Sequence, residues 1–285
     1  MPYRPDVIPA ETLDLIYEYD GSFEGMLCCV FESFAKKEMP SDILSPLRTQ
    51  ASLFPPKEII TDPEKAKRVL SSIQPKMGLE ALELVKNAYL TCMEQKEMDI
   101  LRFLRKGYRI GPAVMSMLTD EVVNRLNSAV THLTREAHLL KGFIRFSIAN
   151  GVLVAQIEPK NYVLPLLVQH FCERYPHERF MIFDKTHGMG LVYQPFRWAI
   201  FPMESLSMPR PDEEEETYRE LWRLFYKTIE IPGRHNERCR MSHMPKRYWK
   251  NMTEMGGAGG CFSQPSIGLQ QGSPGILGDG IHPDS

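Results

Sequence analysis

The chain has 285 residues, a formal net charge of −2, 25% charged residues and 43% hydrophobic residues. This length is enough to bury a core, and this composition excludes wholesale disorder. No apolar run reaches the roughly 18 residues of a membrane span, and the first residues lack the apolar core of a signal peptide, so we expect a cytoplasmic protein without membrane contact. Because the total charge is close to zero, an anionic partner must be inferred from where the charges lie.

The first third of the chain predicts strands and helices in alternation. Residues 13 to 19 alternate apolar and polar side chains, which is typical of a strand, and an Asp-Gly-Ser turn follows. Apolar residues at three- and four-residue steps then predict a helix over 22–37. A short edge strand is expected at 57–61, next to two prolines. Asp62 as the N-cap and Pro63 as the first helical residue predict a helix to about Ile73.

The middle of the chain predicts helices, and the following part predicts hairpins. Helical periodicity dominates to Lys141, with helices expected over 77–92, 95–106 and 119–141. Asn150-Gly151 between two β-rich runs, 143–148 and 152–157, is a strong hairpin signal. A helix over 163–174 and strands near 179–184, 190–194 and 198–201 follow. Consecutive hairpins favour an antiparallel sheet, so the predicted fold is α+β with a helical middle third packed on that sheet.

The last part of the chain predicts a helix and then a tail. An acidic loop at 209–216 leads into a helix expected over 218–229, with its carboxylates near the favourable end of the helix dipole. Residues 255–285 are rich in Gly, Pro and Ser and have little to bury, so we expect a disordered tail. The predicted organisation is therefore a single domain over 1–254 followed by this tail.

The sequence contains no motif for metal binding or covalent catalysis. Its six cysteines include no Cys-x-x-Cys pair, and Cys239 with His243, four residues later, lacks a second pair of ligands. There is no Gly-x-Ser-x-Gly elbow and no phosphate-cradling glycine loop. We therefore expect reduced thiols, no metal and no cofactor, and we leave open whether the protein is an enzyme, with a non-catalytic partner as the favoured interpretation.

Four polar residues flank apolar segments that should be buried: Glu136, His138, Arg145 and His170. A buried charge is costly unless it is paired, so Arg145 is expected either to face solvent or to meet a partner such as Glu136. The structural interpretation is a core ion pair and a hydrogen-bonded histidine. The functional alternative is an acid–base pocket in which the four side chains converge.

A basic block near the end of the predicted domain is the strongest functional signal. Residues 234 to 250 contain six fixed cations and one acid, together with two aromatic residues. Cations neutralise phosphates, and aromatic rings stack on unpaired bases, so this composition is typical of a nucleic-acid contact. The alternative is a solvated surface helix whose aromatic residues pack on the body. The candidate binding residues are Arg234, Arg238, Arg240, Lys246, Arg247, Tyr248, Trp249 and Lys250.

Four motifs, taken in order, resemble one bacterial family. They are Tyr19-Asp20-Gly21-Ser22-Phe23-Glu24-Gly25, then Glu136-x-His138 with Gly142-Phe143-x-Arg145-Phe146, then His170-Phe171-x-x-Arg174, then Met244-Pro245-Lys246-Arg247-Tyr248-Trp249-Lys250. Their order and spacing over residues 13 to 254 are similar to those of the domain of unknown function 4130 family. The chain departs from the pattern at Ile231-Pro232-Gly233, His235 and Glu237.

The resemblance implies a setting in DNA repair or modification. Members are described as DNA metabolism proteins, they look like partners of a radical S-adenosylmethionine protein, and the domain also occurs fused to uracil-DNA glycosylase-like domains. The family offers no established catalytic residues to carry over. Since this chain lacks the cluster cysteines that such enzymes require, the resemblance implies that it is the accessory component.

Three hypotheses follow from the sequence. The first is an accessory protein that binds single-stranded or damaged DNA, or docks the radical S-adenosylmethionine or glycosylase-like enzyme acting on it. The second is a base-processing enzyme with Glu136, His138, Arg145 and His170 in one pocket. The third is a module that binds only proteins, with its partner covering Tyr248 and Trp249.

Overall fold

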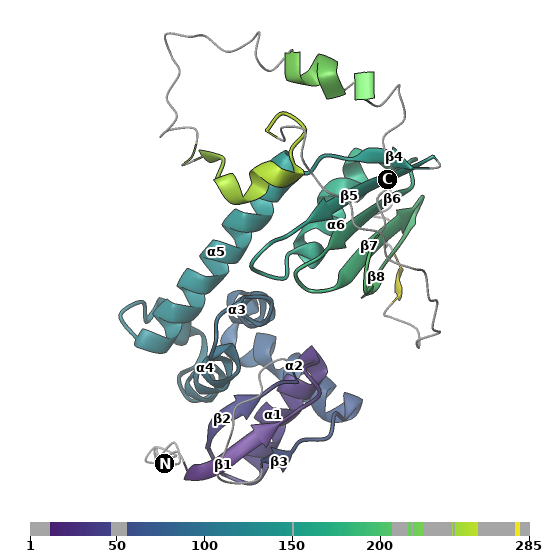
Figure 1. Cartoon of the computed structure of the whole chain (residues 1–285). Coiled ribbons are helices and arrows are strands. Elements are labelled where there is room, and N and C mark those ends of the chain that lie inside the picture. The colour runs from purple at the N-terminus through teal and green to yellow at the C-terminus, as the bar shows by residue number, and fades with distance from the viewer. Residues whose placement is uncertain are drawn as a thin grey trace, which may run out of the picture. The chain divides into compact units, whose positions relative to one another are not determined.

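The structure is a computed structural model, which describes residues 12–46, 56–149, 151–206, 216–217, 219–224, 241, 243–255 and 277–279 (Figure 1). Helices and strands are mixed, so the predicted α+β class is confirmed. Contacts within the chain divide it into two compact units, Met1–Leu133 and Thr134–Ser285. The single domain expected over 1–254 stays a prediction, and each unit is described by itself.

The first unit contains a small parallel sheet. Strand β1 (Thr12–Glu18) lies between β2 (Pro40–Leu44) and β3 (Lys57–Glu58) and is parallel to both. The edge position of β3 agrees with the neighbouring prolines, whereas β2 was not predicted. The connection from β1 to β2 therefore has to cross over, since parallel neighbours cannot be joined by a tight turn, and the helix that follows β1 provides this crossover.

Side-chain caps begin the first two helices of this unit. Helix α1 (Phe23–Ala35) begins where the Ser22 hydroxyl accepts a hydrogen bond from the Gly25 amide at 2.9 Å. Helix α2 (Pro63–Met77) begins at Asp62, whose carboxylate accepts from the amides of Glu64 and Lys65. Both caps satisfy amides that have no partner within their helix.

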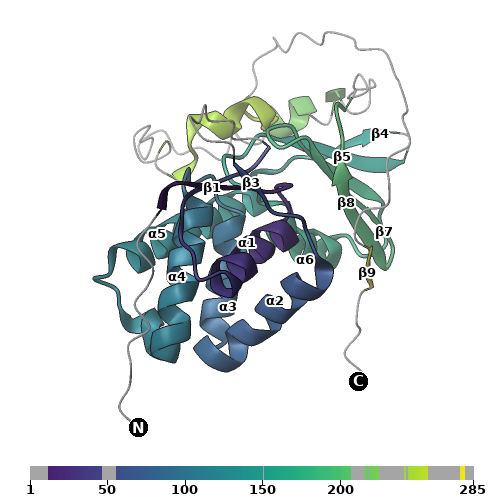
Figure 2. The ribbon, with the colours of Figure 1, turned by 90° about the horizontal axis from the view of Figure 1, so that it is seen from below.

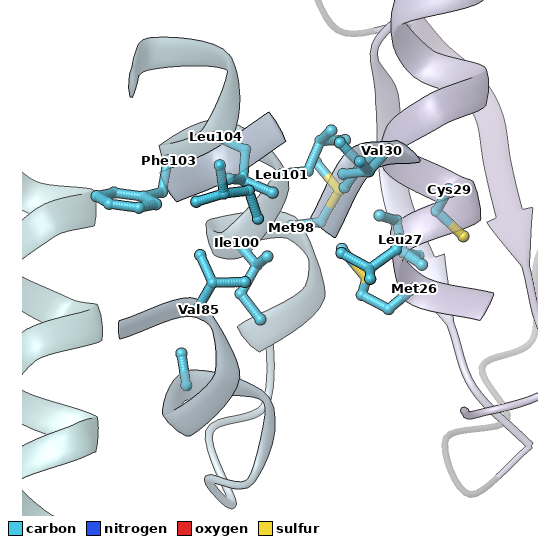
Figure 3. Packing of buried hydrophobic residues seen from close by; sticks show 14 of the residues in the cluster. Met26, Leu27, Cys29, Val30, Val85, Met98, Ile100, Leu101, Phe103 and Leu104 are labelled. Carbon is cyan, nitrogen blue, oxygen red and sulfur yellow. The ribbon is translucent and has the colours of Figure 1, made fainter. Parts of the chain in front are cut away.

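Further helices build the core of the first unit. They are α3 (Leu79–Tyr89), α4 (Lys96–Ile110), the 3₁₀ helix η1 (Gly111–Ser116) and the start of α5 (Glu121–Phe143). Figure 2 shows α1 to α4 packed side by side beneath β1 and β3. Residues of α1, α3 and α4, including Leu27, Val85 and Leu101, pack against one another in the hydrophobic core of this unit (Figure 3). This burial is the main stabilising term of the unit.

The second unit is built on a six-stranded mixed sheet in the order β4-β5-β6-β7-β8-β9. Its strands are β4 (Ser147–Ala149), β5 (Val152–Ile157), β6 (Phe180–Asp184), β7 (Met189–Gln194), β8 (Arg197–Pro202) and β9 (Leu277–Asp279). The predicted hairpin of β4 and β5 is confirmed, and Gly151 has the positive φ of 75° that its turn requires.

The prediction of a purely antiparallel sheet is wrong. Strands β5 and β6 are parallel, with Ile157 opposite Asp184, and the first unit's sheet is parallel as well. Helix α6 (Leu164–Arg174) makes the connection between β5 and β6 possible (Figure 1). Its Phe171 packs against Phe146 and Phe180, with ring centroids 5.5 and 6.3 Å apart, so the helix covers one face of the sheet.

The last part of the sequence contributes several short described segments. Residues 216–217 and 219–224 are helical, in the region where a helix over 218–229 was predicted. The 3₁₀ helix η3 (Lys246–Asn251) follows. Disorder was expected throughout 255–285, but β9 pairs with β8 there; apart from Met255 and β9, this tail lies outside the described residues. Among the described helices, none has the length and hydropathy that crossing a bilayer requires.

Candidate nucleic-acid interface

The Glu136 carboxylate, on α5, ties together three segments of the second unit. Oε2 accepts hydrogen bonds from the backbone amide and side-chain amide of Asn161, at 2.9 and 2.7 Å. Oε1 accepts from the amide of Lys160 at 3.0 Å and from the Tyr248 hydroxyl at 3.2 Å. The residue is 3% exposed, so this charge is almost completely removed from water. Such burial is tolerated because the carboxylate is surrounded by donors.

Tyr248 anchors η3 on this carboxylate. The side chain is buried, and its ring lies 5.6 Å from that of Phe143 at the end of α5. Burial, followed by the nearby negative charge of Glu136, raises the pKa of Tyr248 to about 12. The phenol therefore stays protonated and acts as a donor to the carboxylate. Tyr248 therefore has a structural role. This agrees with the alternative interpretation of the basic block, in which the aromatic residues pack on the body of the protein.

The cations of η3 differ in how strongly they are held. Arg247 forms an ion pair with buried Glu136 at 3.2 Å, and its guanidinium lies over the Tyr248 ring. Lys250 pairs with Glu158, but its side chain is 55% exposed. Lys246 lies over the Trp249 ring and, among the described residues, makes no ion pair with a carboxylate. Exposed ion pairs contribute about 0 to 1 kcal/mol, so Lys250 can exchange Glu158 for a phosphate more easily than Arg247 can leave Glu136.

Trp249 is half-buried, and its indole N–H is already hydrogen-bonded to the segment just before η3. Its indole nitrogen donates to the carbonyl oxygen of Met244 at 2.9 Å, while the Lys246 ammonium lies 5.6 Å from the ring centroid. A base that stacks on this face would therefore have to displace Lys246. The indole thus supports η3 as well as offering an aromatic surface.

Two more lysines lie near the carboxyl end of β5, because β5 and β6 are parallel. Their carboxyl ends meet at one edge of the sheet, where the amide of Lys185 donates to the carbonyl of Ile157 at 3.0 Å. Lys160 lies three residues beyond Ile157 and is held through its amide by Glu136. The 3₁₀ helix η3 is tied to the same segment through Glu136 and Glu158. We name the five exposed cations of these segments the cationic edge: Lys160, Lys185 and, on η3, Lys246, Arg247 and Lys250.

Around the cationic edge, positive charges lie at the surface and most of the nearby negative charges are buried. Two of the carboxylates that contact this part of the unit, Glu136 and Asp184, are buried, and Glu158 is partly exposed. The five cations are exposed. This arrangement presents positive charge to solvent, although the chain as a whole is slightly acidic. Lys160 and Lys185 were not among the predicted residues, because an antiparallel sheet would not bring them to η3.

The four residues of the predicted pocket have different partners. Arg145 pairs with Glu254 rather than with Glu136, through its Nη2 at 2.6 Å and its Nε at 3.3 Å, and Trp222 donates to the same carboxylate. His138 is exposed on α5. His170 lies on α6, where burial and then the positive charges of Lys141 and Arg174 lower its pKa. Glu136 is occupied by Asn161 and η3.

Three of the predicted binding residues, Arg234, Arg238 and Arg240, lie outside the described residues, as does Cys239. Within the described ranges, no three Cys, His, Asp or Glu side chains are grouped as metal ligands would be. The described cysteines are free thiols, of which Cys28 and Cys29 are buried.

Comparison with known proteins gives one clear relationship. The model of a family described as a domain of unknown function, DUF4130, matches residues 94–254. No curated protein matches the chain significantly. A solved pGpG-specific phosphodiesterase from Vibrio cholerae aligns with 69% of this chain and 85% of its own, at 8% identity and a TM-score of 0.27. A TM-score this low does not establish a common fold.

Proposed function

The chain belongs to the DUF4130 family, whose model matches more than half of it, and on this basis we propose that it is an accessory protein of DNA metabolism that holds DNA on the cationic edge. The observation that carries the proposal is the arrangement of Lys160, Lys185, Lys246 and Lys250 around the carboxyl ends of two parallel strands. Lysines and arginines in such a row neutralise successive phosphates and release their counterions.

The way η3 is attached supports a rigid binding surface. Tyr248 and Arg247 hold η3 on the buried Glu136, which also holds the backbone of the Lys160 segment. The backbones that carry the cations of η3 and of that segment are therefore fixed relative to each other. A surface with a fixed backbone loses less conformational freedom when an anion binds, which favours affinity.

The proposal extends to an enzyme partner that acts on the bound DNA. Support comes from two charged residues of the predicted acid–base pocket. Glu136 binds Asn161 and Arg145 binds Glu254, so these two side chains do not face one another in a pocket of this chain's own. In this role the chain would supply DNA affinity, and the partner, of the radical S-adenosylmethionine or glycosylase-like class, would supply the reaction.

The test is DNA binding by the full chain as a function of salt, measured by fluorescence anisotropy on single-stranded and duplex oligonucleotides. The variant Lys246→Ala with Lys250→Ala removes two exposed cations and leaves the Glu136 contacts in place. If both contact phosphates, the slope of log K against log salt should fall by roughly 1.4 to 1.8. Arg247→Ala is less suitable, because it also removes a partner of a buried carboxylate.

A matched control is Lys36→Ala with Lys67→Ala, which removes two exposed cations from the first unit. This pair should leave the slope unchanged. Equal slopes for wild type and for the Lys246 and Lys250 variant would exclude the cationic edge as the DNA contact. Absence of binding at low salt would exclude DNA as the ligand and favour a module that binds only proteins.

A further inference from the structure

A second group of polar side chains lies at the carboxyl ends of β5 and β6, near the cationic edge. Asp184, the last residue of β6, is completely buried, at 0% exposure. Its Oδ1 accepts from the amides of Thr186 and His187, at 3.0 and 3.2 Å, and closes the turn into β7. Its Oδ2 lies 2.6 Å from Nδ1 of His187. The buried charge is therefore balanced by two amides and an imidazole.

The contact with Asp184 determines which ring nitrogen of His187 is available. A carboxylate only accepts hydrogen bonds, so Nδ1 carries the proton that is donated to it, and Nε2 is the nitrogen left for another partner. The side chain keeps 25% of its surface exposed. Tyr162, from the loop between β5 and α6, faces the ring with centroids 5.4 Å apart and limits its movement.

The charge state of the imidazole decides what Nε2 can bind. In the protonated ring, both nitrogens are donors, so Nδ1 donates to Asp184 while Nε2 donates to an anion. In the neutral ring, Nε2 is an acceptor and repels a phosphate oxygen. Among the described residues, the ionisable groups that contact the ring are Asp184 and Tyr162. Lys185 precedes it by two residues and belongs to the cationic edge.

We propose that His187, oriented by Asp184, is an additional phosphate-binding residue that extends the cationic edge, so that DNA is held more tightly in acidic than in alkaline solution. The inference rests on the proposed function. The ligand class is a nucleic-acid phosphate, because Lys160 and Lys185 lie on the two segments that carry Tyr162 and His187. Asp184 is a positioning residue, and His187 is the residue that contacts the ligand.

The experiment measures binding of the full chain to a single-stranded oligonucleotide near pH 6 and near pH 8, across a range of salt. For wild type, the slope of log K against log salt should be steeper by about 0.7 at the lower pH, the value of one phosphate contact. His187→Ala should abolish this difference. His138→Ala, an exposed histidine on α5, should preserve it.

The outcomes separate this inference from the proposed function. Binding with the same pH difference in His187→Ala as in wild type would overturn the inference and leave the cationic edge intact, whereas no binding at either pH would overturn both. A second measurement needs no variant: nitrogen resonances of the histidine rings in wild-type protein are followed as the oligonucleotide is added near pH 6. The Nε2 resonance of His187 should shift, and an unmoved resonance would also overturn the inference.

Discussion

Tyr248 and Glu136 are 112 positions apart in the sequence, yet the hydroxyl of one donates to the buried carboxylate of the other across 3.2 Å. Glu136 also holds the amides of Lys160 and Asn161. One carboxylate thereby fixes the segment after β5 and the 3₁₀ helix η3 in place. The cationic edge depends on this connection, because four of its five cations, all but Lys185, come from these two segments.

Substitutions of Tyr248 and Glu136 should show how much their contact contributes to the free energy of unfolding. Tyr248→Phe removes one donor and should lower the free energy of unfolding by about 1 kcal/mol, whereas Glu136→Gln should cost about 1 to 3 kcal/mol because its amide group would face backbone donors. Urea denaturation of the two single variants and the double variant measures the coupling. Strictly additive losses would show that the two groups do not interact.

The Arg145 and Glu254 pair should matter more than an exposed pair. The carboxylate of Glu254 is 2% exposed, so Arg145→Ala leaves a buried charge without its guanidinium. We expect a loss of about 3 kcal/mol in unfolding free energy. Lys86→Ala breaks the exposed pair with Glu83 and should cost less than about 0.5 kcal/mol. Similar losses for both variants would contradict the assignment of Arg145 to a buried pair.

Two glycine substitutions should have opposite effects. A Cβ on Gly25 in α1 would lie 2.9 Å from Cδ2 of Tyr19 and would also collide with the Asp20 carboxylate, so Gly25→Ala should destabilise the protein by about 1 to 3 kcal/mol. A Cβ on Gly142, in the last turn of α5, would meet no atom within 4 Å, and Gly142→Ala should stabilise by about 0.5 to 1 kcal/mol. Thermal denaturation compares the two variants, and a stable Gly25→Ala protein would be inconsistent with the close approach.

Acid should weaken the fold through His170. Burial and the cations Lys141 and Arg174 lower its pKa in the folded state, so the unfolded chain binds the proton more tightly. Stability is then greatest above the ordinary histidine pKa of about 6.5 and declines as the pH falls from there through the lowered value. His170→Gln should lose less stability than wild type between about pH 7.5 and about pH 5, in denaturant melts at each pH. An equal loss in both proteins would assign the acid sensitivity to other groups.

Local signals predicted much of the fold. Asp62 was predicted as the cap of α2, and Asn150-Gly151 as the turn of a hairpin, because both signals are short-range. Ser22, which caps α1, was predicted only as part of a turn. The parallel pairing of β5 with β6 was missed. The local sequence of a strand does not show whether it pairs antiparallel through a hairpin or parallel through a helical connection. Strand β2, five residues long, carries no alternating pattern in its burial.

The candidate site was predicted only in part. The inward position of Tyr248 and the exposed cations of η3 agree with the composition of the basic block. Pairing was harder to predict: Arg145 joins Glu254, which lies 109 residues away, rather than the nearer Glu136. Lys160 and Lys185 were missed, because the strand ends that carry them are brought together by the parallel pairing of β5 and β6, which depends on contacts between distant residues. The contact between Asp184 and His187 spans only three positions and was missed as well.

The Glu136 network also has a consequence for synthesis on the ribosome. Helix α5 and the Asn161 loop emerge early, but the hydroxyl that completes the carboxylate's shell belongs to a residue made 112 positions after Glu136. Until η3 has been translated, the nascent second unit carries a negative charge that lacks two of its partners in the folded protein, Tyr248 and Arg247. A chain truncated before η3 should therefore be a better target for cellular proteases than one that contains it.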